Sequence, residues 1–233
     1  ARGRMGSVTC AAVRAAADLE LVGETDVGDD LVARLAELAP DVVVDFTVAS
    51  AALPNLEAIL AGGSAAVMGT SGFGADEVAR ARELTRRHGR PALVAPNFAV
   101  GSVLLARFAA EAARDLPHVE LIEAHHDKKE DAPSGTALKV ARDVAAARRE
   151  VPAAPTAESV PGVRGGVVDG VRVHALRVPG LLARMECLFG GPGDTLTLRH
   201  DTLTRESFMP GVLLAVRRVR ELDGLVYGLE HLL

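Results

Sequence analysis

Short apolar runs alternate with segments of helical periodicity over about the first 97 residues. Residues 42–44 (Val-Val-Val) and 65–68 (Ala-Ala-Val-Met) are apolar without alternation, which is typical of strands covered on both faces. Strands that alternate with helices indicate crossover units and a parallel sheet with helices on both sides. The pattern predicts strands at 19–24, 41–46, 65–68 and 92–95 and helices at 6–17, 49–60 and 75–88.

The pattern changes near residue 101, after which strands become more frequent. Apolar and polar residues alternate over 171–177, 183–189 and 195–201, as in antiparallel strands with one covered face. The other elements predicted here are helices at 101–114, 135–149 and 210–222, a strand at 119–124 and a Pro/Ala-rich loop at 151–161. The last helix is expected to return to the first part of the protein.

These elements predict an α/β protein of two domains. Residues 1–99 and 209–233 would form a Rossmann-type nucleotide-binding domain. Residues 100–208 would form an α+β substrate-binding and oligomerisation domain with a mixed, mostly antiparallel sheet. One face of that sheet has no helix left to cover it, so we expect it to be buried against another subunit of a homo-oligomer. A solution mass equal to one chain would contradict this expectation.

Composition narrows the class of protein. The formal net charge is −5 and the chain has one Tyr, six Phe and no Trp, whereas nucleic-acid binding calls for a basic surface and stacking aromatics. No apolar run approaches the ~20 residues that a membrane-spanning helix needs. The two cysteines, Cys10 and Cys187, lack CxxC spacing. We expect a cytoplasmic protein with two free thiols and without nucleic-acid or membrane partners.

Two glycines stand at the start of the chain. Gly3 and Gly6 have the spacing of the last two glycines of a dinucleotide-binding loop, and Asp26 lies where an acidic side chain would bind ribose hydroxyls. The alternatives are an ordinary glycine turn and a solvated turn carboxylate. Such a fold begins with a central strand that delivers the first glycine, and that strand is absent here. We therefore expect the sequence to be trimmed, with roughly ten further residues ending in glycine before Ala1; intact mass checks this.

The densest chemistry lies in residues 123–137, between a predicted strand and a predicted helix. Pro133, Ser134, Gly135 and Thr136 form a plausible helix start, whose unpaired backbone N–H groups would bind a carboxylate or a phosphate.

His125, His126 and Lys129 lie just upstream of this helix start. They offer two groups that titrate near neutrality and one ammonium that donates a proton or holds an anion. A metal site is disfavoured, because adjacent side chains on a strand point in opposite directions and the chain has no second His/Cys cluster. The alternative is a solvated charged turn over 127–131, and Lys139 is best interpreted as an exposed helix residue.

A longer set of motifs resembles one family. The run His-His-x-x-Lys-x-Asp-Ala-Pro-Ser-Gly-Thr at 125–136 is similar to the signature of the dihydrodipicolinate reductases, also named 4-hydroxy-tetrahydrodipicolinate reductases. The resemblance extends over essentially the whole chain. Its other motifs are Gly3-Arg4-Met5-Gly6, Val44-Asp45-Phe46-Thr47, Gly69-Thr70-Ser71-Gly72, Ala95-Pro96-Asn97-Phe98 and Arg199-His200-Asp201.

The resemblance implies a reaction and roles for individual residues. It implies reduction of 4-hydroxy-tetrahydrodipicolinate to tetrahydrodipicolinate in L-lysine and diaminopimelate biosynthesis, with hydride from nicotinamide C4, no metal, and a homotetramer. His125 takes the acid/base position and Lys129 the proton-donor position. The residues expected to bind the substrate, a small cyclic dicarboxylate, are His126, Ser134, Gly135 and Thr136.

The cofactor expected from the resemblance is NADH or NADPH. We expect NADH to be preferred, because the Asp26 carboxylate repels a 2′-phosphate, while Arg2 and Arg4 offset part of that repulsion. Ser71 replaces the usual second Thr of the Gly-Thr-Thr-Gly motif and keeps a hydroxyl. The residues expected to bind the cofactor are Arg2, Gly3, Arg4, Met5, Gly6, Asp26, Gly69, Thr70, Ser71, Ala95, Pro96, Asn97 and Phe98.

Two rival functions remain open on the residues alone. Aspartate and homoserine dehydrogenases are nicotinamide enzymes of similar architecture, but the signature at 125–136 argues against them. A non-catalytic nucleotide sensor could keep the same fold, yet it would not need His125, His126 and Lys129 together. An assay of NADH oxidation separates the sensor from the enzymes.

Overall fold

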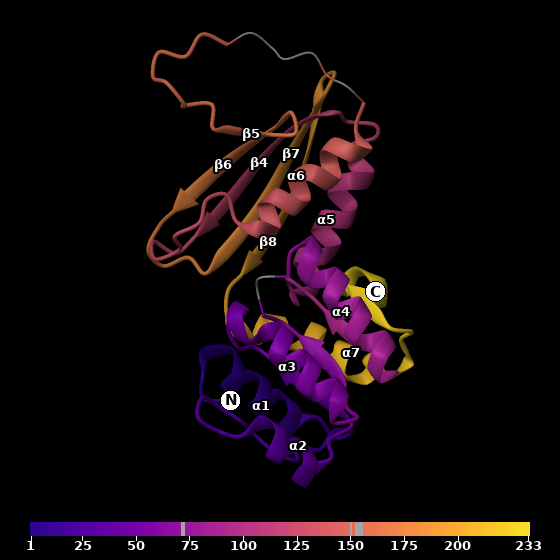
Figure 1. The fold of residues 1–233 in the computed structure, drawn as a ribbon. Coiled ribbons are helices and arrows are strands. Elements are labelled where there is room, and N and C mark those ends of the chain that lie inside the picture. The colour runs from indigo at the N-terminus through magenta and orange to yellow at the C-terminus, as the bar shows by residue number, and fades with distance from the viewer. Residues whose placement is uncertain (71–72, 150, 152–155) are drawn as a thin grey trace. The chain divides into compact units, whose positions relative to one another are not determined.

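The structure is a computed structural model that describes residues 1–70, 73–149, 151 and 156–233. The chain forms two compact units (Figure 1). The first consists of Ala1–Val100 together with Arg205–Leu233, and the second consists of Gly101–Thr204. The second unit is therefore inserted in the sequence of the first.

The first unit is built on a parallel sheet. Its strand order is β1-β2-β3-β9, and every neighbouring pair is parallel. The bounds are β1 Val42–Asp45, β2 Ala65–Met68, β3 Ala92–Val94 and β9 Leu225–Tyr227. All residues of β2 and β3 are buried, in agreement with their uninterrupted apolar sequence.

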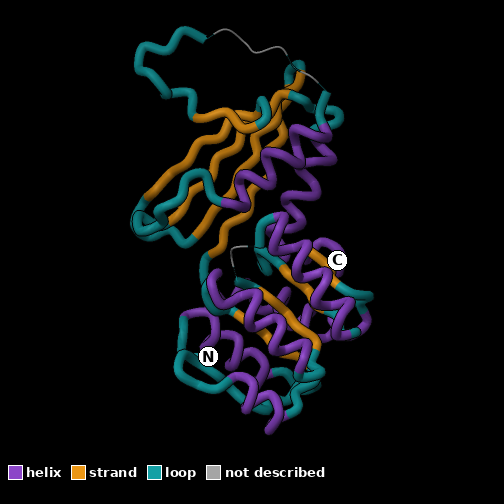
Figure 2. The backbone as a smooth tube through the Cα atoms, viewed as in Figure 1, coloured by secondary structure: helices purple, strands orange, loops and turns teal. Residues whose placement is uncertain are grey.

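Helices accompany this sheet, as Figure 2 shows. Their bounds are α1 Arg4–Ala15, α2 Leu31–Leu38, α3 Ala49–Ala61, α4 Ala75–His88 and α7 Met209–Arg218, with 3-10 turns at Arg205–Phe208, Val219–Glu221 and Leu229–Leu232. Leu56 and Ile59 of α3 pack with Met68 and Val94 in one core cluster. Helix α4 has acidic residues in its first turn and basic residues in its last turn, which complements the helix dipole.

The second unit is built on a mixed sheet of order β5-β6-β4-β7-β8. Strand β4 pairs in parallel with β6, and the other neighbouring pairs are antiparallel. The bounds are β4 His118–His125, β5 Gly166–Val168, β6 Val171–Arg177, β7 Ala183–Gly191 and β8 Asp194–Thr202. The predicted fold class, a Rossmann-type domain with a mixed and mostly antiparallel second sheet, is confirmed.

Two helices cover one face of this sheet: α5, Val100–Ala112, and α6, Gly135–Ala147 (Figure 1). Leu105 of α5 and Val140 of α6 pack against Leu121 of β4 in a single core cluster. On the opposite face, Leu176 and Leu188 are exposed to 47% and 41%. Within this unit the sheet therefore has one apolar covered face and one open face.

Most predicted elements, the first helix among them, occur within a few residues of their expected bounds, but the expected strand at 19–24 is wrong. Residues 19–24 form no strand and pair with no described strand, since the sheet ends at β1. The first helix begins at Arg4 instead of Gly6, because Gly3 has the extended backbone of an N-cap and Ser7 already donates to its carbonyl. The short elements α2, β5 and β9 were not predicted, and residues 152–155 of the expected loop lie outside the described residues.

Candidate active site

Strand β4 carries the acid/base candidates at its carboxyl end. Because side chains alternate along a strand, Leu121, Glu123 and His125 share the face of β4 that packs into the core. The pairing register sets His125 beside Arg177 of β6 and Ala183 of β7. Beyond the apolar core, this face thus ends in a carboxylate, an imidazole and a guanidinium.

Glu123 is the centre of this group. Its side chain is 0% exposed, and its two oxygens accept hydrogen bonds from Nδ1 of His125 at 2.5 Å and from Nη2 of Arg177 at 2.9 Å. Burial acts to raise the pKa of Glu123, but the bonds from His125 and Arg177 outweigh it and hold the pKa below its ordinary value. Glu123 is therefore an ionised carboxylate inside the protein at neutral pH.

Arg177 also holds the loop that carries Lys129. Besides Glu123, its guanidinium donates to the carbonyl oxygen of Lys129 at 3.3 Å and to that of Asp131 at 2.6 Å. The Lys129 ammonium in turn pairs with the Asp131 carboxylate at 2.6 Å, and that bond is the main cause that lowers the pKa of Asp131. The lysine is thus fixed at both its backbone and its ammonium group.

The predicted helix start is where α6 begins. Ser134 is its N-cap, with an extended backbone and a side-chain oxygen that accepts from the N–H of Ala137 at 3.2 Å. The N–H groups of Gly135 and Thr136 belong to the first turn, whose donors have no partner within a helix. A Cβ at Gly135 would meet nothing within 4 Å, so this end of the helix faces open space. Such a terminus is suited to a carboxylate.

The structure brings His125, Lys129 and the start of α6 onto one scaffold, and it adds two residues that sequence reasoning missed. The sequence carried a signal for Glu123, because a carboxylate two residues before a histidine lies on the same face of a strand. It carried no signal for Arg177, because the position of this residue beside His125 depends on the pairing of β4 with β6. The roles assigned to the predicted site residues stay predictions.

His200 lies on the covered side of β8, opposite Met185 of β7, which is in turn opposite Glu123. Burial lowers the pKa of its imidazole. Its ring lies against Gly101, where a Cβ would come within 2.5 Å of it. His200 is therefore part of the same row of side chains as Glu123.

In the first unit, the start of α1 lies beside Asp26. The carboxylate accepts from the backbone N–H groups of Arg2 at 2.5 Å and Val27 at 2.8 Å, and these bonds lower the pKa of Asp26. Gly6 lies in the first turn of α1, where a Cβ would be 2.6 Å from the carbonyl oxygen of Ala1. The predicted loop and the predicted ribose carboxylate are therefore neighbours.

The carboxyl ends of β1 and β2 are joined through Asp45, which sequence analysis left without a role. Its buried carboxylate accepts from Thr47 N and Oγ1, both at 2.7 Å, from Thr70 Oγ1 at 2.8 Å and from Asn55 Nδ2 at 2.7 Å. Asp45 therefore fixes Thr70 at the edge of the sheet where nucleotides bind in such folds. Ser71 lies outside the described residues.

Two glycines allow close packing at the same edge of the sheet, the carboxyl ends of its strands. A Cβ at Gly69 would overlap the ring of Phe46, and that ring packs edge-on against Phe98 with centroids 5.7 Å apart. The carbonyl of Phe98 lies so close to Gly211 of α7 that a Cβ there would overlap it. Asn97 accepts from the N–H of Ala99 at 2.8 Å and closes the turn. Gly69, Thr70 and residues 95–98 are thus held by packing at the carboxyl ends of the strands.

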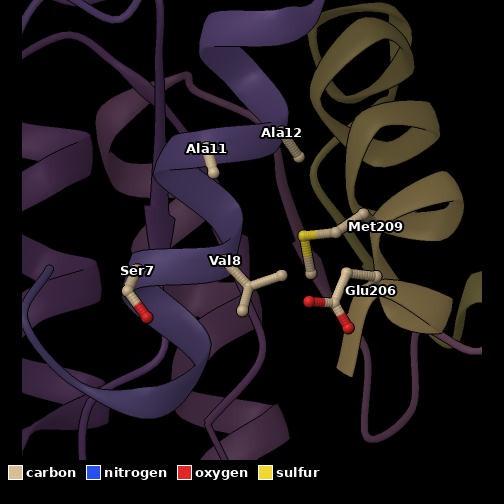
Figure 3. A pocket seen from close by; sticks show the side chains of 6 residues that line it. All are labelled: Ser7, Val8, Ala11, Ala12, Glu206 and Met209. Carbon is tan, nitrogen blue, oxygen red and sulfur yellow. The ribbon is translucent and has the colours of Figure 1, made fainter. Parts of the chain in front are cut away.

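The first unit also has an open pocket of about 340 Å³ between α1 and the 3-10 turn before α7 (Figure 3). The side chains of Val8 and Met209 point toward one another across it. The residues that line it are Ser7, Val8, Ala11, Ala12, Glu206 and Met209. None of them is a predicted site residue.

The part of the chain that the structure describes lacks two further features. There, no group of three or more His, Cys, Asp or Glu side chains could hold a metal ion. None of the helices described is both long and apolar enough to cross a membrane.

The first unit has a parallel sheet with a glycine-containing helix start, and the second unit gathers a histidine, a lysine and a buried carboxylate on the scaffold that also carries the N-terminus of α6. This is the organisation of a nicotinamide-dependent oxidoreductase. Comparison with known proteins makes the class more specific.

The family described as "Dihydrodipicolinate reductase, N-terminus" matches residues 1–98, and "Dihydrodipicolinate reductase, C-terminus" matches residues 101–233. The chain is 48% identical over 236 residues to the 4-hydroxy-tetrahydrodipicolinate reductase of Mycobacterium ulcerans (strain Agy99), covering 100% of this chain and 96% of the relative. It is 51% identical over 235 residues to the 4-hydroxy-tetrahydrodipicolinate reductase of Beutenbergia cavernae, and the match covers 99% of this chain and 94% of that relative.

Among solved structures, the chain is similar to the dipicolinate-bound dihydrodipicolinate reductase from Paenisporosarcina sp. TG-14. The TM-score is 0.88 at 37% sequence identity, and the match covers 100% of this chain and 96% of that chain. The chain belongs to the dihydrodipicolinate reductase family. The resemblance stated from the motifs is confirmed, and the protein is an oxidoreductase with a nucleotide-binding domain that uses NAD(P)H.

Proposed function

We propose that the protein reduces 4-hydroxy-tetrahydrodipicolinate to tetrahydrodipicolinate in L-lysine and diaminopimelate biosynthesis. One observation carries the proposal: the buried Glu123 carboxylate and the partly buried Arg177 guanidinium bonded to it hold His125 and the loop of Lys129 on one scaffold. The names of the relatives and the dipicolinate in the similar structure support a small cyclic dicarboxylate as the substrate.

The second unit offers positive charge and donors for such a substrate. The N–H groups of Gly135 and Thr136, with the side chains of Ser134 and His126, are proposed to bind its carboxylates. Orienting the substrate ring against the cofactor is the main task of these contacts, because orientation alone removes a large part of a bimolecular barrier.

Protonation is proposed to come from Lys129, with His125 as the neighbouring acid/base group. When bound, NAD(P)H supplies a hydride to ring C4 of the dehydrated substrate. The electron pair of the C=C bond then moves onto the adjacent carbon, which takes a proton from the Lys129 ammonium. That ammonium is held by Asp131 at 2.6 Å, so the proton donor has a fixed position before the reaction.

The residues of the first unit fit a dinucleotide. The start of α1 at Gly3 provides backbone N–H donors, Arg2 and Arg4 add positive charge, and a Cβ at Gly3 would meet nothing within 4 Å. We propose that Arg2, Gly3, Arg4, Met5, Gly6 and Asp26 bind the adenine half and that Gly69, Thr70, Ser71, Ala95, Pro96, Asn97 and Phe98 bind the nicotinamide half. We also propose a preference for NADH over NADPH, because Asp26 is acidic.

A homotetramer and a cytoplasmic location complete the proposal. The open face of the second sheet exposes apolar side chains, among them Val167, Leu176 and Leu188, which a neighbouring copy would cover. Cys10 and Cys187 are free thiols, as in a reducing compartment. Light scattering that returns the mass of one chain would contradict the tetramer.

The activity is tested by following NADH oxidation in the presence of freshly generated substrate. Lys129→Ala is expected to lower kcat by about 100-fold or more with little change in NADH affinity, because it removes a positioned proton donor. Lys139→Ala is the control, since Lys139 pairs with Asp143 on an exposed face of α6. Oxidation of NADH with a homoserine-pathway substrate instead, or NADH binding without turnover, would overturn the proposal.

A further inference from the structure

We propose that Glu123 and Arg177 are positioning residues of the active site. Glu123 fixes the imidazole of His125 with the proton on Nδ1 and Nε2 left for the substrate, and Arg177 couples the same carboxylate to the Lys129 loop. This inference rests on the proposed function, because it assigns roles to residues that act through His125 and Lys129.

The first support is the free-energy cost of burying the Glu123 carboxylate. Glu123 is wholly buried. Its apolar neighbours on the covered face of the sheet include Met185, opposite it on β7, and Leu121, two residues earlier on β4. A carboxylate there loses its hydration, and an apolar side chain of similar size generally serves stability equally well or better. A carboxylate at this position thus stabilises the fold no better than an apolar side chain would. In the low dielectric of the interior, however, it forms a stronger hydrogen bond with the imidazole of His125.

The second support is the tautomer. The pKa of Glu123 lies below its ordinary value, so the group at 2.5 Å from Nδ1 is a carboxylate, which only accepts hydrogen bonds. Nδ1 must therefore carry the proton, and a neutral His125 presents the lone pair of Nε2. The same negative charge stabilises the imidazolium that forms when Nε2 takes a proton.

The third support is the reach of Arg177. Its Nη2 lies 2.9 Å from Glu123 Oε1 and 2.6 Å from the carbonyl oxygen of Asp131, and its Nε lies 3.3 Å from the carbonyl oxygen of Lys129. One planar guanidinium therefore connects the strand end to the loop at the proposed proton donor, Lys129, and again at Asp131, two residues further along. Lysine in its place would keep the charge but lose this fork of donors.

The charged surroundings of His125 are few among the described residues. Glu123 lies on its own strand, Arg177 on β6, and Lys129 and Asp131 in the loop. The residue opposite on β7 is Ala183, which has no charge. Among these groups, Glu123 is the one that bonds the His125 ring directly, so its replacement should decide the tautomer of His125.

The test compares Glu123→Gln with Glu120→Gln. Glu120 is on the same strand and also bonds a histidine and an arginine, His174 and Arg164, so it is a matched control. Nitrogen-15 NMR of labelled imidazoles reports directly which nitrogen of His125 is protonated. We expect Nδ1–H in the wild type and in E120Q. In E123Q we expect this single tautomer to be lost, because an amide can either accept from Nδ1 or donate to it. We also expect a kcat lower by about 10- to 100-fold, the range seen when a partner that orients a metal-bound histidine is lost.

Arg177→Gln keeps the test decisive if E123Q does not fold. Arg172→Gln is its control, because Arg172 is on the same strand and bonds the carbonyl oxygen of Arg164 at 3.2 Å. R177Q is expected to keep the Nδ1–H tautomer and to lose at least about 10-fold in kcat, with the KM for NADH unchanged.

Each result has one meaning. An Nδ1–H tautomer of His125 that stays fully populated in E123Q, or a kcat in R177Q within threefold of that in R172Q, would overturn the positioning role. A wild type that shows the Nδ1–H tautomer but does not reduce the proposed substrate would instead overturn the proposed function, because the NMR measurement needs no substrate.

Discussion

Two Glu–His–Arg clusters lie around carboxylates on opposite faces of strand β4, and we propose an acid/base role for only one of them. Glu123, His125 and Arg177 form the inner cluster, in which the carboxylate is 0% exposed. Glu120 forms the outer cluster with His174 and Arg164, and its side chain is 33% exposed. In both clusters the bonds to histidine and arginine outweigh burial and lower the pKa of the carboxyl.

The two clusters differ in which imidazole nitrogen is bound. Glu123 bonds Nδ1 of His125, the nitrogen nearer the backbone, whereas Glu120 bonds Nε2 of His174 at 2.8 Å. The other nitrogen of His174 lies against Gly165, where a Cβ would be 2.8 Å from it. Both nitrogens of His174 therefore have close neighbours, although its side chain is 25% exposed against 16% for His125. Among the described hydrogen bonds none uses Nε2 of His125, which leaves that nitrogen for the proposed substrate. Residue types alone do not define a site; the orientation that the backbone gives them does.

The largest expected difference between the clusters is in activity. His125→Asn should lower kcat/KM by about 100- to 10,000-fold, because it removes an acid/base group, whereas His174→Asn should leave kcat/KM within threefold of the wild type. Steady-state NADH oxidation measures both. Equal losses in the two variants would mean that the inner cluster has no special chemical role.

The next difference is in stability. Glu123→Ala removes the buried carboxylate that pairs with Arg177, but the guanidinium is 19% exposed and keeps its bonds to the carbonyl oxygens of Lys129 and Asp131. The free energy of unfolding should therefore fall by about 1–3 kcal/mol. Glu120→Ala breaks a solvent-screened group and should cost about 0–1 kcal/mol. Urea unfolding followed by circular dichroism gives both values. Similar costs would show that burial does not separate the clusters.

A smaller difference is expected in the acid range. The pKa of Glu123 is lower in the folded protein than its unfolded value of about 4.3, so the unfolded chain binds the proton first. Its stabilisation is fully present above about pH 4.3 and is lost as the pH falls through the folded pKa. The pKa of Glu120 is also lowered, so its effect on stability has the same pH dependence, but solvent screens its interactions with His174 and Arg164.

The measurement is the free energy of unfolding between about pH 5 and pH 3, at about 0.1 M and about 1 M salt. Glu123→Gln should flatten this pH dependence at both salt concentrations, whereas Glu120→Gln should flatten it only at the lower one. A salt-sensitive effect in Glu123→Gln would contradict the assignment of an interior carboxylate.

The smallest expected effect extends the comparison to a carboxylate of the first unit. Asp26 is held by backbone N–H groups of Arg2 and Val27 instead of by side-chain cations. Asp26→Ala should shift the NADH/NADPH ratio of kcat/KM toward NADPH by about fivefold, the scale of one exposed charge interaction, without changing kcat for NADH. Asp18→Ala, which breaks an exposed pair with Arg217, is the control. An unchanged ratio would remove Asp26 from the cofactor site.

Elements with a strong local signal could be predicted from the sequence. The strand at β2 is uniformly apolar, and α4 has acidic residues at its start and Gly89 in the left-handed conformation at its end, so both follow from neighbouring residues. Residues 19–24 have a strand-like composition but no partner among the described residues, and composition cannot supply one. The three-residue β5 and β9 are too short to carry a periodic signal.

The candidate site likewise contains parts with a local sequence signal and parts that depend on strand pairing. The helix start at Ser134 and the His125–Lys129 run are local in sequence and were predicted from it. The pair Glu123–Arg177 joins residues 54 apart and depends on the parallel register of β4 with β6. That register is a property of the assembled sheet, so no window of sequence contains it.

The insertion of the second unit has a consequence for synthesis. All residues of that unit, through Thr204, leave the ribosome before the last strand of the first unit, Leu225–Tyr227, which pairs with β3. Every residue of the inner Glu–His–Arg cluster is therefore synthesised before α7 and the edge strand β9 of the nucleotide sheet. The first unit can complete its sheet only after the whole second unit has been made.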